Sequence, residues 1–62
     1  MIKFKDLLMI TGAGTKVKIG YEKRKGFIYT GKLKDAPPIE ADAEVTNIYV
    51  FDGEDALTII LN

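Results

Sequence analysis

The chain of 62 residues contains no cysteine, histidine, tryptophan or serine. Without cysteine it can form neither a disulfide nor a thiolate zinc site, and without histidine it lacks the commonest metal ligand and general base. Threonine, tyrosine, lysine and carboxylates are the catalytic groups that are left, and none shows the spacing of a nucleophile–base pair or of paired carboxylates. We therefore expect a protein that is not an enzyme and that holds no metal or cofactor.

Long hydrophobic runs are also missing. The run from Leu7 to Ile10 spans four residues, whereas a bilayer-spanning helix needs about 20 apolar residues and the core of a signal peptide about 7 to 15. We therefore expect a soluble, cytoplasmic protein that does not associate with membranes. Residues 1–62 are expected to form one domain. Because so small a domain buries little surface and has no covalent staple, it depends on close packing or on oligomerisation.

The charges that are present are sorted along the chain. All nine lysine and arginine residues lie at or before Lys34, and seven of the nine acidic residues lie after it. The first 34 residues therefore carry a net charge of +7 and the last 28 a net charge of −7, although the whole chain is formally neutral. Such a chain either folds one half against the other or pairs with a neighbouring molecule or ligand.

A short helix is predicted over residues 3–10. Phe4, Leu7 and Leu8 are three and four positions apart and form one apolar stripe. Gly12 follows the last turn and can take the left-handed conformation that ends a helix. A helix of this length is marginal alone, so we expect it to lie against a sheet.

The first predicted hairpin follows the helix, because from Thr15 onward apolar and polar residues alternate with the period of a strand. A three-residue loop over residues 24–26 ends in a glycine, which suits the left-handed position of such a loop. This loop pairs Tyr21 with Tyr29 and continues the same register to the end of the hairpin. A slip by one residue would place lysines opposite core residues, so we prefer this register.

The second predicted hairpin joins strands over residues 46–50 and 57–61. Residues 34–44 contain both prolines and no apolar period, and they form the connection to this hairpin. Residues 52–55 form its turn, which the dipeptide Asp52-Gly53 indicates. They lack the spaced oxygen ligands of a calcium-binding loop. The turn places Ile48 opposite Ile59.

These elements predict an α+β fold, in which a short N-terminal helix is followed by a four-stranded antiparallel meander. The sequence does not decide whether the sheet curls toward a small SH3-like barrel or stays open with the helix on one face.

An apolar surface is predicted on the second face of this sheet. Ile28, Tyr49, Phe51 and Ile60 fall out of phase with the main core stripe, and a sheet with one helix can bury only one face fully. Either barrel closure covers these side chains, or another protein or a second copy of the chain does so. We identify the four residues as the candidate protein interface.

A lysine-rich face is the alternative candidate site. The predicted register directs four lysines of the first hairpin to one side, with Lys18 opposite Lys32, and adds the basic loop between the strands. Such a face could bind nucleic acid or a phosphate ligand, or it could be solvated or neutralised by the acidic residues of the connection. The candidate residues are Lys16, Lys18, Arg24, Lys32 and Lys34.

Several segments together resemble a group of short, uncharacterised proteins encoded in phages and prophages. The resemblance covers most of the chain and rests on Lys5-Asp6-Leu7-Leu8, Thr15-Lys16-Val17-Lys18-Ile19, Tyr29-Thr30-Gly31, Asp35-Ala36-Pro37, Val45 to Val50 and Asp52-Gly53. It implies an accessory protein that acts by binding a host or phage component, and it supplies no catalytic residues.

The sequence therefore predicts a small binding protein that acts through protein–protein contact, as a phage-type accessory or inhibitor and as a homo-oligomer. Nucleic-acid or phosphate binding through the lysine-rich face is the alternative. A small-molecule pocket between two chains is left open.

Overall fold

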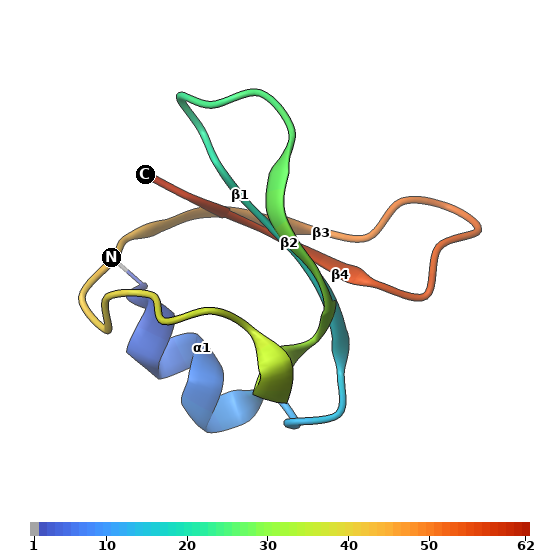
Figure 1. Cartoon of the computed structure of the whole chain (residues 1–62), viewed down its shortest axis with the longest axis horizontal. Coiled ribbons are helices and arrows are strands. Elements are labelled where there is room, and N and C mark those ends of the chain that lie inside the picture. The colour runs from blue at the N-terminus through green and yellow to red at the C-terminus, as the bar shows by residue number, and fades with distance from the viewer. Residues whose placement is uncertain (1) are drawn as a thin grey trace.

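The computed structural model describes residues 2–62 and shows one short helix packed beneath a four-stranded sheet (Figure 1). The elements in chain order are α1 (Phe4–Ile10), β1 (Lys16–Tyr21), β2 (Phe27–Lys32), the 3₁₀ helix η1 (Leu33–Asp35), β3 (Val45–Tyr49) and β4 (Leu57–Leu61). The fold is therefore α+β, as the sequence predicts. No helix among the described residues is long and apolar enough to cross a bilayer.

The sheet is mixed, and the prediction of an antiparallel meander is wrong. Its strand order is β2-β1-β4-β3, with antiparallel pairing in the two hairpins and parallel pairing between β1 and β4. The outer strands β2 and β3 lie at opposite edges and do not pair with each other. The sheet is therefore open, and the described part of the chain does not close into an SH3-like barrel.

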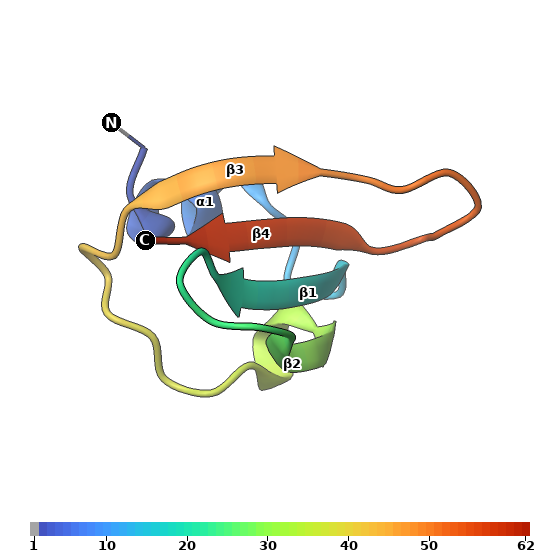
Figure 2. The same ribbon diagram turned by 90° about the horizontal axis from the view of Figure 1, so that it is seen from above.

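The connection after η1 explains this order. It passes along one end of the sheet from the β2 edge to the β3 edge (Figure 2). Hydrogen bonds tie its end to the N-terminal segment: the Phe4 amide donates to the Ala43 carbonyl at 2.8 Å, and the Val45 amide to the Ile2 carbonyl at 2.9 Å. The chain consequently re-enters the sheet at the far edge, and β4 fills the position beside β1.

The core lies between α1 and the lower face of the sheet (Figure 1). Ile19 on β1 and Ile59 on β4 are its fully buried centre, and burial of each stabilises the fold by about 1.5–3 kcal/mol. The whole cluster consists of Phe4, Leu7, Val17, Ile19, Leu33, Val45, Ile59 and Leu61. Helix α1 supplies only the first two, because Leu8 turns outward and is 44% exposed.

The first hairpin differs from its predicted register by two residues. Tyr29 pairs with Ile19 instead of Tyr21, and Gly31 pairs with Val17. The Tyr29 side chain folds over Gly31, and its hydroxyl donates to the Lys32 carbonyl at 2.6 Å. Leu33 then leaves the strand and enters the core from η1. A shift by two preserves the faces, so the lysines still point away from the core.

A β-bulge also interrupts this hairpin. Gly20 pairs with Phe27 whereas the preceding Ile19 pairs with Tyr29, so Ile28 is the extra residue. The bulge changes the phase of the strand and places the Phe27 ring against Gly20, where an added Cβ would lie 3.2 Å from Phe27 Cδ1. Phe27 is therefore 45% exposed, although strict alternation with Tyr29 would place it on the core side. In the second hairpin the predicted pairing of Ile48 with Ile59 is confirmed, but β3 ends at Tyr49 and its register shifts between Val45 and Asn47.

Candidate functional site

The upper face of the sheet, which we call the free face, carries both candidate sites. Helix α1, η1 and the connection lie below the sheet, and no helix or strand of residues 2–62 covers it from above (Figure 1). Val17 and Ile19 point down into the core, so the alternating Lys16 and Lys18 point to the free face. Parallel pairing with β4 places Thr58 next to Lys18 on this face.

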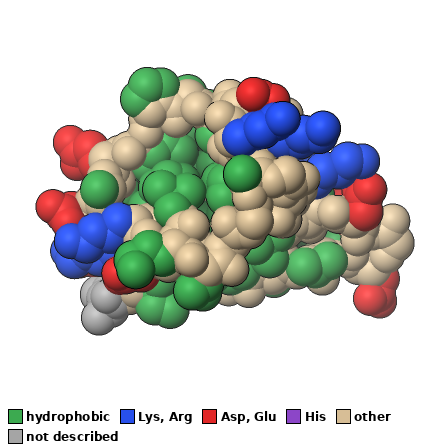
Figure 3. Space-filling model, turned by 90° about the horizontal axis from the view of Figure 1, so that it is seen from below, with side chains coloured by type: hydrophobic (Ala, Val, Ile, Leu, Met, Phe, Trp, Pro, Cys, Tyr) green, Lys and Arg blue, Asp and Glu red, His purple; other side chains and the backbone are tan. Residues whose placement is uncertain are grey.

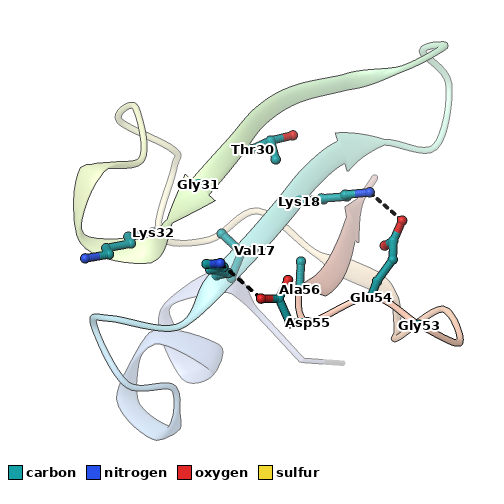
Figure 4. Close-up of a pocket in the computed structure, with 10 residues that line it drawn as sticks. Val17, Lys18, Thr30, Gly31, Lys32, Gly53, Glu54, Asp55 and Ala56 are labelled. Atoms are coloured by element: carbon teal, nitrogen blue, oxygen red, sulfur yellow. Dashed lines mark hydrogen bonds and ion pairs between the residues drawn. The ribbon is translucent and has the colours of Figure 1, made fainter.

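A groove of about 470 Å³ lies at one end of the free face, and Figure 4 shows the residues around it. Strands β1 and β2 form one wall, and the end of the β3–β4 loop forms the other. The lining residues are Lys16, Val17, Lys18, Thr30, Gly31, Lys32, Gly53, Glu54, Asp55 and Ala56. The groove thus brings basic residues from the first 34 residues of the chain against acidic residues from the last 28.

Two ion pairs cross the groove (Figure 4). The Lys16 ammonium lies 3.0 Å from Asp55 Oδ2, and the Lys18 ammonium lies 2.8 Å from Glu54 Oε1. The basic and acidic halves of the chain therefore meet within one molecule at this position. Both pairs are solvent-accessible, and ion pairs in contact with water contribute little to stability.

The Lys16–Asp55 pair changes the acidity of its carboxyl group. The hydrogen bond from the Lys16 ammonium, and after it the positive charge of that ammonium, lower the pKa of Asp55 below its ordinary value. The carboxylate therefore stays ionised to a more acidic pH than a free aspartate does, and it continues to hold Lys16 over that range.

Lys32 is the third lysine of the groove and has a different environment. It is the direct cross-strand partner of Lys16, and like charges in this position repel each other. Within residues 2–62 its ammonium makes no ion pair, whereas Lys16 has Asp55 and Lys18 has Glu54. The groove therefore contains one lysine that no acidic residue of the described chain neutralises.

The five basic residues predicted from the sequence do not all lie at this site. Lys16, Lys18 and Lys32 line the groove, whereas Arg24 lies in the β1–β2 turn and Lys34 in η1. The predicted pairing of Lys18 with Lys32 is wrong, since the two-residue shift places Thr30 opposite Lys18. Sequence analysis also missed Glu54 and Asp55, because it assigned them only to a turn.

Of the four predicted apolar residues, Tyr49 and Phe51 contact each other, Ile60 lies near Phe27, and Ile28 is the bulge residue of β2. The rings of Tyr49 and Phe51 meet edge to face, with centroids 4.9 Å apart. Ile60 and Phe27 both lie against the free side of Gly20. Phe51 is 50% exposed and Ile28 is 37% exposed, whereas Tyr49 and Ile60 are partly buried.

A second apolar surface lies on the α1 side of the molecule. Viewed from below, hydrophobic side chains gather near the centre, and most charged side chains lie toward the rim (Figure 3). Met9 and Ile10 at the end of α1 are 84% and 83% exposed, more than any apolar residue of the sheet. The sequence did not predict this surface, because the predicted apolar stripe of the helix describes only the side that faces the sheet.

Comparisons with protein-family models, with curated proteins and with solved structures found no match to this chain. Within residues 2–62, no group of three or more histidine, cysteine, aspartate or glutamate side chains is placed to hold a metal ion.

Proposed function

We propose that this chain is a small, non-enzymatic binding protein that acts through protein–protein contact in the cytoplasm, as a homo-oligomer. The observation that carries the proposal is the exposure of aromatic side chains on the free face, where Phe27 is 45% and Phe51 is 50% exposed. Exposed apolar surface on a sheet face is typical of a protein contact. The resemblance to short phage and prophage proteins suggests the role of a phage-type accessory or inhibitor.

Charge complementarity favours a second copy as the occupant of the free face. The basic turn Lys23–Lys25 follows β1, and the acidic loop Asp52–Asp55 precedes β4. Because β1 and β4 are parallel, these segments lie at opposite ends of the sheet (Figures 1 and 2). Two copies stacked face to face about a two-fold axis perpendicular to the strands would place each basic turn over the partner's acidic loop.

Light scattering on the purified protein, at low and at high salt, tests this proposal. We expect a dimer mass that decreases at high salt for the wild type, and a monomer mass for Phe51→Asp, because the substitution buries a charge in the proposed contact. Met9→Asp on α1 is the matched control and should remain a dimer, since Met9 lies outside that contact. A wild-type monomer at high protein concentration would exclude homo-oligomerisation.

The control variant Met9→Asp also tests whether the interface lies on the α1 side of the molecule. If Met9→Asp dissociates the dimer and Phe51→Asp does not, the interface lies on the α1 surface instead of the free face. Circular dichroism of both variants verifies that they fold, which is expected because both side chains are half or more exposed.

The second candidate function is binding of a phosphate-bearing ligand or nucleic acid through the lysines of the free face. The specific observation in its favour is the convergence of Lys16, Lys18 and Lys32 at one groove. Phosphate contacts make affinity strongly salt-dependent. We therefore expect binding of a single-stranded oligonucleotide to weaken steeply between 50 and 200 mM salt, and Lys18→Glu with Lys32→Glu to weaken it further. Salt-independent affinity would exclude this mode.

A further inference from the structure

The contacts in the groove resemble those that lysines make with phosphate oxygens. Glu54 and Asp55 each place one carboxylate oxygen 2.8–3.0 Å from a lysine ammonium, close to the distance of charge-assisted hydrogen bonds to carboxylate or phosphate. Both acids come from one loop, and both lysines come from one strand. The loop therefore presents two anionic groups to two cations, as an oligophosphate would.

The β1–β2 hairpin also contains a repulsion that these acids only partly relieve. Lys16 and Lys32 are direct cross-strand partners, and Asp55 contacts Lys16 without making an ion pair to Lys32. An anion that bound both ammonium groups would remove the like-charge repulsion that the free protein retains. The hydroxyl of Thr30 and the backbone at Gly31 lie in the same wall and add polar groups.

Few contacts hold the acidic loop Asp52–Asp55 against β1, so the loop can move away from that strand. Pairing of β3 with β4 ends at Tyr49 and Thr58, and residues 51–55 are all exposed. Within the loop, one backbone hydrogen bond joins the Glu54 amide to the Phe51 carbonyl at 3.1 Å. Among the described residues, the polar contacts between this loop and β1 are the two ion pairs, of which Lys16–Asp55 is largely exposed and Lys18–Glu54 partly buried, and such pairs are individually weak.

We propose that the groove is a binding site for a small phosphate-bearing ligand, and that Glu54 and Asp55 occupy it in the free protein as a built-in competitor. The ligand's phosphoryl oxygens replace the two carboxylates on Lys16 and Lys18 and recruit Lys32, and the loop swings away from β1. The volume of about 470 Å³ lies in the range of small-molecule sites, so the proposal commits to a small ligand instead of a nucleic-acid strand.

This inference rests on the second candidate function and specifies its ligand and its regulation. The two proposals differ in the expected effect of removing the charges of Glu54 and Asp55, which an experiment can measure. Nucleic-acid binding needs only an accessible basic face, whereas the proposed site predicts that removal of two acidic charges strengthens binding of a small inorganic polyphosphate.

The experiment is a titration of the full chain with inorganic tripolyphosphate at low salt. Calorimetry measures the affinity, and amide chemical shifts locate the binding site. Glu54→Gln combined with Asp55→Asn removes the competitor and should tighten binding about fivefold, because two exposed ion pairs no longer have to break. Lys32→Glu should weaken binding about tenfold or more, since it reverses the charge that no loop acid neutralises. Lys25→Glu in the turn is the matched control and should bind within about twofold of the wild type.

The expected shift changes lie on Lys16, Lys18, Lys32 and residues 51–56. Three outcomes would overturn the proposal: no binding of tripolyphosphate by either the wild type or the double-acid variant, equal affinity of these two proteins, or equal losses for Lys32→Glu and Lys25→Glu. If an oligonucleotide binds with steep salt dependence while tripolyphosphate does not bind, the second candidate function stands and this inference fails.

Discussion

The two faces of the sheet are made by the same strands but are stabilised by different forces. The lower face carries Ile19 and Ile59, which are fully buried beneath α1, and it depends on close packing and on the removal of apolar surface from water. The free face carries Lys16 and Lys18, which are neutralised by a loop in contact with solvent. The comparison indicates that the lower face determines whether the chain folds, and that the free face can change without loss of the fold.

The largest expected effect is on the lower face. Ile59→Ala should lower the free energy of unfolding by about 2–5 kcal/mol, because it removes buried methyl groups and leaves a cavity. That loss is a large part of the whole stability of a domain this small. Urea denaturation followed by circular dichroism measures it, and Phe51→Ala on the exposed side is the control, with an expected loss below about 1 kcal/mol. Equal losses in the two variants would contradict the comparison.

The next effect concerns the position where β2 bends toward the core. Gly31 has a φ of +152°, and a Cβ added there would lie 2.7 Å from Tyr29 Oη. Gly31→Ala should therefore cost about 1–3 kcal/mol, because the backbone is strained and the tyrosine must move. Gly14→Ala is the control, since an added Cβ meets no atom within 4 Å, and it should be neutral or slightly stabilising in thermal unfolding.

A smaller effect of opposite sign is expected at Thr58, on the free-face side of β4. Thr58 is fully buried in β4, and its hydroxyl oxygen has no hydrogen-bond partner among the described residues. Thr58→Val keeps the shape and removes the unsatisfied polar group, so it should raise the unfolding free energy by about 1 kcal/mol. Thr46→Val is the comparison variant: the Thr46 hydroxyl donates to the Ile60 carbonyl at 3.3 Å, so no gain is expected there. A loss of stability in Thr58→Val would mean that its hydroxyl does have a partner.

The smallest effect is the pH response of the groove. Because Lys16 lowers the pKa of Asp55, their contact is fully present above the ordinary aspartate pKa and is lost as the pH falls through the lowered value. We expect the side-chain carboxyl resonance of Asp55 to titrate below the ordinary pKa of aspartate, while the amide shifts of β4 stay constant. Asp55→Asn should abolish this titration and leave the global unfolding transition almost unchanged. Titration of Asp55 at its ordinary pKa would contradict the contact.

The outcome for the two hairpins shows what the pattern of residues can predict. The pairing of Ile48 with Ile59 was predicted correctly, because an acidic turn with one glycine joins two strands of matching phase. The first register was wrong by two residues, because packing of the Tyr29 ring over Gly31 and a bulge at Ile28 both depend on neighbouring strands. The alternation still assigned Lys16 and Lys18 correctly to the side away from the core.

The candidate sites were predicted to a similar extent. Three of the five proposed basic residues meet at the groove, because alternation along β1 and β2 is a local property. The acids opposite them were missed, since the β3–β4 loop reaches β1 only because β4 lies beside it in the mixed sheet. A signal for that central position was present: Leu57-Thr58-Ile59-Ile60-Leu61 is apolar at consecutive positions apart from one threonine, which is typical of a strand with neighbours on both sides.

The sequence by itself determined the short helix, the four strands, the alternation that separates lysines from core residues, and the division of charge between the two halves of the chain. These properties follow from local periodicity and composition, which can be read in each segment without knowing which other segments it contacts. The tertiary structure alone decided the strand order, the parallel β1–β4 pair, and the meeting of Glu54 and Asp55 with Lys18 and Lys16. The reason is that a connection tied to the N-terminal segment carries the chain across the sheet, and no local pattern encodes where such a crossing ends.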